Sequence, residues 1–546
     1  MRKAVQCLSL LAFTVLFLLA TYRLPEWLPA DIYLRIDPLV GLTSVIASRA
    51  LIARVLWALV LIAATLALGR FFCAWLCPLG ACLDFLAPLT AAKGRPSMLP
   101  DESRRRWKYL LLVAMLAAAL TGLSLVHFFD PIVILTRFYT FVLHPLAVSL
   151  LNPLLDLIRF PARWLGWSGL AHLQLSQPVY DTALATALIF AVLLALSRLA
   201  PRFWCRYLCP LGALLSLVSP FGLFKRRVGK EACNTCLACQ KQCPMGAIGD
   251  DPLRTRSAEC IQCRRCADIC PQKAISFSPA LAGTGEYDRF SLTRRGALWS
   301  LGGGVALGFL SLRTPDALLA GKRQLIRPPG ALPEAEFLRT CIRCGECMKS
   351  CVTNTLQPCL WESGMAGLWT PKAELRLAAC EPNCNVCGRV CPTQAIRALP
   401  MEEKTCARIG TAVLRKEMCL AWAQDKVCLI CDEACPFNAI VFRNVEGLRR
   451  PVVVASRCNG CGYCEQQCPV QGESAIVVTT DGEIRLTEGS YVREAARQQL
   501  NFKPGTGDDR FEVREPGSRA EEEGGQKAPT GGADGKPAPG KPRGFL

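Results

Sequence analysis

The first 225 residues alternate between apolar stretches and short basic segments. An α-helix needs about 20 apolar residues to cross a bilayer, and four stretches come close to that length. They are Ala4–Ala20, Ala50–Leu68, Tyr109–Phe129 and Tyr180–Leu199. We predict that each of them is a membrane-spanning helix. Residues 130–178, between the last two stretches, are expected to form an external loop.

Lysine and arginine residues lie between the second and third apolar stretches and again after the fourth. Positive residues are enriched on the cytoplasmic side of membrane proteins. The pattern therefore predicts a four-helix bundle with its N-terminus inside. The formal net charge of +19 has the same explanation, so we expect no nucleic-acid partner.

A weaker apolar segment, Gly296–Leu312, follows Arg294 and Arg295. Paired arginines before such a segment are typical of a twin-arginine export signal. The alternative is a fifth spanning helix with its positive flank inside. Both interpretations place the rest of the chain outside the cytoplasm.

Cysteine is the unusual component of the composition, with 32 residues. Two runs have the spacing Cys-x-x-Cys-x-x-Cys-x-x-x-Cys-Pro of [4Fe–4S] ferredoxins, in which the fourth cysteine binds the other cluster of a pair. The predicted ligand sets are Cys233, Cys236, Cys239 and Cys270 for one cluster, and Cys260, Cys263, Cys266 and Cys243 for the other. Structural zinc is the alternative, but zinc sites use Cys-x-x-Cys pairs without the third cysteine.

Four more runs follow the weaker apolar segment, which brings the expected number of clusters to six. The first gap is lengthened after Cys380 and Cys419, and Val352 stands where proline usually follows the fourth cysteine. With the same exchange of fourth ligands, the predicted sets are Cys341, Cys344, Cys347 and Cys391; Cys380, Cys384, Cys387 and Cys351; Cys419, Cys428, Cys431 and Cys468; and Cys458, Cys461, Cys464 and Cys435.

An eleven-residue pattern with a Cys-x-x-x-Cys-Pro-Leu-Gly turn occurs twice, at Phe71–Ala81 and Phe203–Ala213. The repeat predicts two copies of a helix pair. Our hypothesis is that the four turn cysteines meet around one further cluster: Cys73, Cys77, Cys205 and Cys209. The alternative is that they are ordinary buried cysteines. We expect a packing role for the cysteines outside all patterns, which are Cys7, Cys82, Cys359 and Cys406.

The predicted external loop carries residues typical of a membrane interface, namely Phe138, Tyr139, Arg159, Arg163, Trp164 and Trp167. We hypothesise that a membrane quinol docks among them and that His144 accepts its proton. The alternative is that this segment only anchors the helices. The chain has no Cys-x-x-Cys-His motif, which excludes covalently attached c-type haem, and a haem held by two of His127, His144 and His172 is not favoured.

The predicted fold class is an α-helical membrane bundle, with four spanning helices and a fifth signal or anchor helix, joined to ferredoxin-like α+β domains. Residues 1–225 are expected to form the bundle and 226–285 a two-cluster ferredoxin. Residues 286–325 hold the signal or anchor helix, and 326–485 form a four-cluster domain. The tail, 486–546, becomes rich in Gly, Pro, Glu and Lys and is expected to be disordered.

Two resemblances follow from these motifs. Residues 1 to 280, with both Cys-x-x-x-Cys-Pro-Leu-Gly turns, resemble the NapH-type membrane ferredoxins of periplasmic nitrate reductase systems. Residues 290 to 480, with Arg294-Arg295 and the long gap between Cys419 and Cys428, resemble the exported NapG and MauM type. The resemblance implies a fusion of the two, with clusters of residues 1–290 on the cytoplasmic side and residues 326–546 in the periplasm.

The implied function is that of a quinol dehydrogenase component in the inner membrane. It would pass electrons from quinol to a periplasmic oxidoreductase or cytochrome, leaving through Cys458–Cys468 or Cys341–Cys351. An alternative of the same chemistry is a reductant for the maturation of another redox enzyme. A redox sensor is a third hypothesis, but no signalling domain is recognisable in the sequence.

Overall fold

The structure is a computed structural model that describes residues 1–21, 25, 28–90, 101–167, 175–279, 293–313, 325–360, 362, 364–445 and 447–502. These residues all lie within one folded unit, Met1–Pro504. The predicted disordered tail lies almost wholly outside the described residues, and so do most of the residues that flank the predicted signal or anchor helix.

The described residues up to 221 are mainly helical and consist of two copies of one order of elements. Each copy has a long helix, a helix that begins at an Asp-Pro pair, an apolar helix, a cysteine-containing turn and a closing helix. The first copy comprises α1 (Arg2–Leu19), α3 (Pro38–Ser48), α4 (Ala58–Leu68), α5 (Phe71–Trp75) and α6 (Pro78–Thr90). The second comprises α7 (Asp101–Leu120), α9 (Pro131–Phe138) with η2 (Tyr139–Leu143) and α10 (His144–Trp164), α12 (Ala183–Leu196), η3 (Trp204–Leu208) and α13 (Pro210–Val218). Short connecting elements are α2 (Ile32–Arg35), η1 (Ala53–Trp57), α8 (Val126–Phe129) and η4 (Ser219–Phe221).

The two copies meet at their Asp-Pro pairs. The carboxylate of Asp37 accepts hydrogen bonds from the backbone N–H groups of residues 39 and 40, and Asp130 accepts from residues 132 and 133. The proline that follows each aspartate has the φ angle that a first helical residue needs, so both helices begin in the same way. The two carboxyl groups lie close to each other in the interior. The duplication therefore includes three helices before each cysteine turn, and not the single pair that the sequence predicted.

The structure corrects the prediction of an external loop over residues 130–178. Residues 131–164 are one continuous helical run, α9 to α10, because their apolar residues follow a helical period. Among the described residues, two helices are long and apolar enough to cross a membrane: Arg2–Leu19 and Pro131–Trp164. The first matches a predicted span and the second lies in the predicted loop. The other three predicted spans overlap α4, α7 and α12, and α3 was not predicted.

The ferredoxin of residues 224–279 is built on one antiparallel strand pair. Strand β1 (Phe224–Val228) pairs with β2 (Ile275–Pro279), with Arg226 opposite Phe277. Between them lie two single-turn helices, α14 (Ala238–Lys241) and α15 (Arg265–Asp268). The apolar core of this ferredoxin is thin, so metal binding would supply much of its folding free energy.

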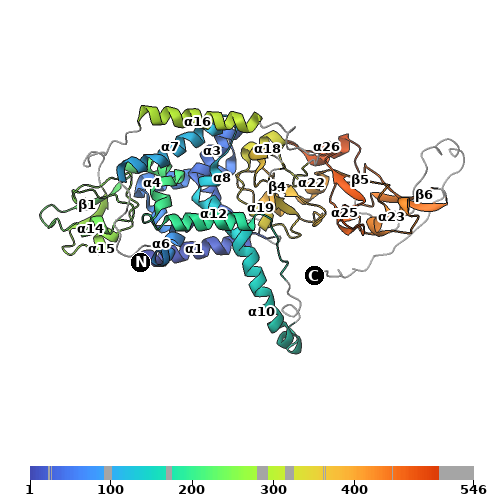
Figure 1. Cartoon of the computed structure of the whole chain (residues 1–546), viewed down its shortest axis with the longest axis horizontal. Helices are drawn as coiled ribbons and strands as arrows, with labels where there is room; N and C mark the ends of the chain where they lie inside the picture. The colour runs from blue at the N-terminus through green and yellow to red at the C-terminus, as the bar shows by residue number, and fades with distance from the viewer. Residues whose placement is uncertain are drawn as a thin grey trace, which may run out of the picture. The chain divides into compact units, whose positions relative to one another are not determined.

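Helix α16 (Arg294–Arg313) contains the weaker apolar segment and packs along α7, as Figure 1 shows. The glycines that face α7 leave no room for a larger side chain. A Cβ atom on Gly304 would lie 2.9 Å from the Cβ of Ala117, and one on Gly308 would lie 2.8 Å from the Cβ of Thr121. Small residues four apart let two helices approach closely in membranes. The small residues thus explain how α16 packs closely on α7.

The last described region, residues 325–502, consists of short helices and three two-stranded antiparallel sheets. The sheets are β3–β4, β5–β8 and β6–β7, formed by Leu356–Pro358 with Pro371–Ala373, Thr411–Leu414 with Ile476–Thr479, and Ile440–Val445 with Leu448–Val453. The helices are α18 (Glu334–Thr340), α19 (Glu346–Lys349), α20 (Gly364–Gly367), α21 (Val386–Arg389), α22 (Met401–Cys406), α23 (Leu420–Ala423), α24 (Ile430–Glu433), α25 (Tyr463–Gln467) and α26 (Tyr491–Arg497).

Candidate iron–sulfur sites

The ferredoxin of residues 224–279 brings its cysteines together around two cavities. Cys233, Cys236, Cys239 and Cys270 line one cavity. Cys243, Cys260, Cys263 and Cys266 line another. In both cavities the fourth cysteine comes from the other run.

Residues 325–502 repeat this arrangement. The cavities are lined by Cys351, Cys380, Cys384 and Cys387; by Cys419, Cys428, Cys431 and Cys468; and by Cys435, Cys458, Cys461 and Cys464. The fourth predicted set is also assembled. The thiol of Cys347 faces those of Cys344, Cys341 and Cys391. We refer to each site by its first cysteine, so these are the Cys380, Cys419, Cys458 and Cys341 sites.

A recurring backbone conformation curls the regular cysteine runs. In each, the residue two places before the third cysteine has a positive φ: Leu237 (58°), Arg264 (60°), Gly345 (88°) and Gly462 (85°). The residue two places after the first cysteine does too: Thr235, Gln262, Arg343 and Gly460. Such turns gather backbone N–H groups around a concavity that suits anionic clusters. The runs with lengthened first gaps differ, with φ of −127° at Asn385 and −112° at Leu429.

The sites suit a cluster better than a single ion. Among the described residues, no three His, Cys, Asp or Glu side chains are placed to hold one metal ion. The thiols instead surround a cavity, and backbone N–H groups donate to several of them. Ala247 N lies 3.2 Å from Cys243 Sγ, and Ala439 N lies 3.3 Å from Cys435 Sγ. Hydrogen bonds of this kind tune iron–sulfur clusters, so the residues fit [4Fe–4S] groups.

The thiols must lose their protons when iron binds. Burial and the neighbouring thiols of Cys428 and Cys419 together raise the pKa of Cys431 to about 12. A thiol with this pKa is protonated at neutral pH, while a metal ligand is a thiolate. Cluster insertion therefore releases protons, and iron content will fall as the pH of assembly is lowered.

The four sites of residues 325–502 form a spatial series that differs from their order in the sequence. Cys347 of the Cys341 site faces Cys387 of the Cys380 site. Next, Cys380 N donates to Cys461 O at 2.8 Å, which links the Cys380 and Cys458 sites. Finally, Cys464 faces Cys431. The spatial order is therefore Cys341, Cys380, Cys458 and Cys419, with the last two exchanged relative to the sequence.

The Cys341 site lies against the helical half. Arg54 donates to the carbonyl oxygens of Arg389 and Cys391 at 3.2 and 2.9 Å. Lys349 donates to Ala20 O at 3.0 Å, and Ile342 belongs to the apolar core of the helices. At the other end of the series, Val427 beside the Cys419 site is 87% exposed. The Cys341 site is therefore the inner end of the series and the Cys419 site the outer end.

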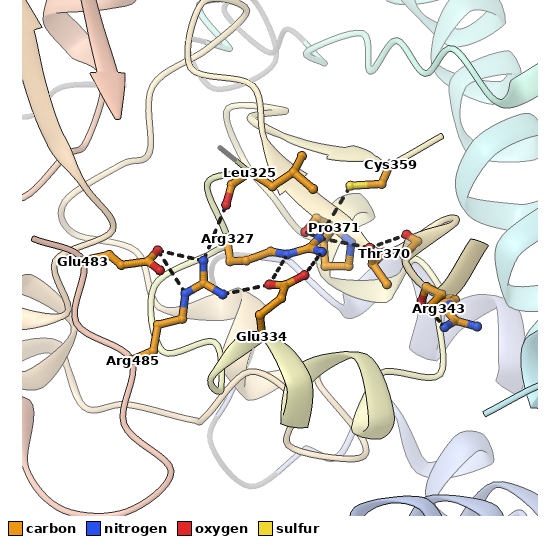
Figure 2. A network of polar contacts seen from close by, with 11 residues as sticks. Leu325, Arg327, Glu334, Arg343, Cys359, Thr370, Pro371, Glu483 and Arg485 are labelled. Carbon is orange, nitrogen blue, oxygen red and sulfur yellow. Dashed lines mark hydrogen bonds and ion pairs between the residues drawn. The ribbon is translucent and has the colours of Figure 1, made fainter. Parts of the chain in front are cut away.

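A network around Arg327 holds the Cys341 region together (Figure 2). The buried guanidinium donates to Glu334 at 3.0 Å, to Thr370 Oγ1 at 3.0 Å and to Cys359 Sγ at 3.5 Å. Arg485 donates to Glu334 from the opposite side at 2.8 Å. Burial alone would raise the pKa of Glu334, but its hydrogen bonds and ion pairs with both arginines hold that pKa below the usual range.

The two Cys-x-x-x-Cys-Pro turns also come together in the structure. The thiol of Cys209 faces those of Cys205, Cys73 and Cys77. Three of these four thiols are buried, and Cys73 is half-buried. Two short sections of chain, far apart in the sequence, thus place four cysteines in one group.

The cysteines for which we expected a packing role lie apart from these groups. Cys359 is fully buried against Arg327, Cys7 is exposed, and Cys82 and Cys406 are half-buried. None of them lines one of the five cavities described above.

The residues expected around a quinol are only partly assembled. Tyr139 packs edge-on against Phe13 and Phe17, and His144 lies 6.2 Å from Phe17 between ring centroids. Phe138 stacks on Phe190 at 3.9 Å. The other predicted interfacial residues lie at the distant end of α10 or beyond it, where Trp164 is 84% exposed. Of the candidate haem ligands, His127 lies against Arg343 and His172 lies outside the described residues.

Comparisons with known proteins agree with this chemistry. The sequence family described as "4Fe-4S binding domain" matches twice, at residues 50–96 and 182–231. Families described as "4Fe-4S dicluster domain" match residues 225–271 and 426–471. The double match covers both cysteine turns and supports the duplication. No solved structure matches the chain.

Curated relatives match parts of the chain. The methylamine utilization ferredoxin-type protein MauM of Methylophilus methylotrophus is 36% identical over 184 residues, 32% of this chain and 80% of that protein. The ferredoxin-type protein NapG of Escherichia coli K12 is 35% identical over 179 residues, 31% of this chain and 74% of that protein. YccM of E. coli, whose name includes the words electron transport protein, is 32% identical over 201 residues, 36% of this chain and 47% of that protein.

The fold and the cysteine sites define an iron–sulfur electron-transfer protein of the ferredoxin type. Within that class, the chain belongs to the family of ferredoxin-type proteins that includes MauM and NapG. The match to that family accounts for about a third of the chain.

Proposed function

We propose that the chain takes electrons from membrane quinol and passes them through [4Fe–4S] clusters to a redox partner in the periplasm. Such clusters carry one electron at a time. In this proposal the helices cross the inner membrane, residues 224–279 face the cytoplasm and residues 325–502 face the periplasm. The ligands of the six clusters are the six cysteine sets described above. The observation that carries the proposal is the contact between the Cys341 site and the helices beside His144.

The quinol would bind near the ring of Phe17. Tyr139 lies 5.5 Å from this ring and shares a hydrogen bond of 3.2 Å with Thr14. His144 Nδ1 is buried and has no hydrogen-bond partner among the described residues. Lys349, between two ligands of the Cys341 region, lies 4.8 Å above the same ring. These residues thus combine a ring-binding surface, an available proton acceptor and direct contact with the first cysteine site.

Oxidation of one quinol to quinone releases two electrons and two protons. His144 would take one proton, because its Nδ1 has no hydrogen-bond partner among the described residues and imidazole can act as a general base. The two electrons would leave one after the other through the Cys341 site. From there the spatial series leads to the Cys419 site, so we propose that electrons leave at this outer end and not through the Cys458 or Cys341 site.

The test uses the intact protein in lipid vesicles without oxygen. Reduced quinol is added, and the visible absorbance of the clusters is followed. We expect bleaching, and we expect His144→Gln to slow it by about 100-fold or more, the usual contribution of a general base. Dithionite should bleach both proteins equally.

Two outcomes would reject the proposal. One is an absence of bleaching by quinol in the wild-type chain. The other is bleaching only by a low-potential donor added on the cytoplasmic side. The second outcome would favour a reductant that serves the maturation of another redox enzyme.

A further inference from the structure

The two Cys-x-x-x-Cys-Pro turns have equivalent local geometry. Each second cysteine directly precedes a helix that begins with proline, α6 or α13. Gly80 N lies 3.4 Å from Cys77 Sγ, and Gly212 N lies 3.2 Å from Cys209 Sγ. An N–H donor at a helix N-terminus stabilises a thiolate. Both sulfurs are thus held in positions that favour metal binding.

Two arginines cross between the repeats at this point. Arg70 and Arg202 occupy the same place, three residues before the first cysteine of each turn. Arg202, in the second repeat, donates to Cys73 O at 2.9 Å and to Gly80 O at 3.2 Å in the first. Arg70, in the first repeat, lies against the second, and a Cβ on Gly212 would be 2.9 Å from its Nη2. Arg202 therefore holds the turn of the first repeat, and Arg70 lies against the turn of the second.

The two arginines differ in how their donors are used. Arg202 also pairs with Asp84 at 2.9 Å, so its nitrogens face protein oxygens. Arg70 donates through Nη1 to Ala258 O at 2.8 Å and lies 3.5 Å from Glu259. Its Nε and Nη2 have no hydrogen-bond partner among the described residues, although the side chain is 0% exposed.

A buried guanidinium with unused donors costs free energy unless an acceptor lies beside it. The charge of Arg70 faces the sulfurs of Cys73 and Cys209. We propose that Cys73, Cys77, Cys205 and Cys209 hold a single [4Fe–4S] cluster between the two repeats, and that Arg70 donates hydrogen bonds to it. This inference goes beyond the quinol proposal and does not depend on it.

The location of this site suggests its role. Trp75 Nε1 donates to Gln262 O at 3.1 Å, beside the Cys260 site. Arg202 faces both Cys205 and Cys263, a cysteine from each of the two sites. The inter-repeat site is therefore the point where the ferredoxin of residues 224–279 meets the helices. One electron would move between the two sites, with one site oxidised as the other is reduced and no bond made or broken.

The first experiment counts iron and spectroscopic signals in the full chain, purified without oxygen. We expect Cys77→Ser and Cys209→Ser each to remove about four irons and the same single electron paramagnetic resonance signal, because one cluster takes ligands from both repeats. Unchanged iron in both variants would overturn the proposal. Loss of two different signals, or of about one metal ion, would overturn it as well. Quinol is not used, so this result is independent of the function proposed above.

The second experiment tests the role of Arg70 by redox titration of that signal. We expect Arg70→Gln to retain iron and to lower the equilibrium constant for reduction about tenfold, which is ~59 mV for a one-electron couple. Arg202→Gln is the matched control and should shift the potential less, because Asp84 already offsets its charge. Arg70→Lys keeps the charge but loses the planar donors and should give an intermediate shift. Equal shifts in Arg70→Gln and Arg202→Gln, or no shift in Arg70→Gln, would overturn direct donation by Arg70.

Discussion

The two ferredoxin regions share their ligand spacing but differ in their surroundings. In residues 224–279, Cys236 is exposed and Cys233 and Cys270 are half-buried. In residues 325–502, Cys341 and Cys344 are buried where the region meets the helices. The same cysteine motif thus provides an accessible site in one region and an enclosed site in the other. What differs is the part of the chain that covers each motif.

The two regions also differ in the number of arginines close to their cysteines. Around the Cys341 site, Arg137 faces Cys344, while Arg327 and Arg343 face Cys341. At the Cys233 site, Arg226 lies 3.6 Å from Cys239 Sγ. Reduction adds negative charge to a cluster, so nearby positive charge favours it. We therefore expect the Cys341 site to be the more easily reduced of the two, as an acceptor of quinol electrons must be.

The largest effect is expected when a cysteine ligand is removed from the middle of the four-site series. Cys461→Ser should lose about four irons and stop electron transfer from the Cys341 site to the Cys419 site. The two ferredoxin sites of residues 224–279 should remain reducible. The measurement is iron content together with the rate of reduction of an external acceptor. Cys406→Ser is the control, and a full rate in Cys461→Ser would contradict the spatial order.

The next largest effect is expected at the contact between the Cys341 site and the helices. Arg343 donates to Ser124 O at 3.0 Å and also to Ala366 O. A hydrogen bond to a charged group contributes about 1.5–3 kcal/mol, so Arg343→Met should weaken this contact by at least that amount. Hydrogen exchange should then rise in α8 and at residues 341–351.

The matched control is Arg376→Met. Arg376 also donates to backbone carbonyl groups, those of Glu465, Cys468 and Val470, but all of them lie within residues 325–502. This variant should lose stability without an increase of exchange in α8. Equal exchange in α8 for both variants would show that the contact does not depend on Arg343.

A smaller effect is expected where α16 connects the two regions. Gly304→Leu should destabilise its packing against α7 by about 1–3 kcal/mol, because extra carbons do not fit. Gly303→Leu is the control, since no atom lies within 4 Å of a Cβ at that position. Thermal unfolding in detergent measures the difference. Equal melting temperatures would contradict the close packing of the two helices.

The smallest effect is expected at Cys359. Cys359→Ser keeps a hydrogen-bond acceptor for Arg327, and we expect a loss of stability below about 1.5 kcal/mol with no loss of iron. Iron analysis and chemical unfolding check this expectation. Loss of about four irons would instead show that Cys359 is a ligand and that one predicted set is wrong.

The sequence was most informative about the cysteines. Ligand spacing follows from the geometry of the cluster, so local patterns such as Cys458 to Cys468 predict the class of site without the rest of the fold. The sequence was least informative about the helices. Residues 131–164 were predicted to be a loop because their aromatic and basic residues suggested a membrane interface, although the segment is helical.

The sequence alone determined the chemistry of this protein, since cysteine spacing, the duplicated turns and the order of apolar segments are local properties. Only the tertiary structure decided which groups are neighbours. It placed the Cys458 site before the Cys419 site, the Asp37 carboxyl against Asp130, and Arg70 beside the cysteines of the opposite repeat. These contacts join residues far apart in the chain, and they depend on packing and burial, which no short sequence pattern records.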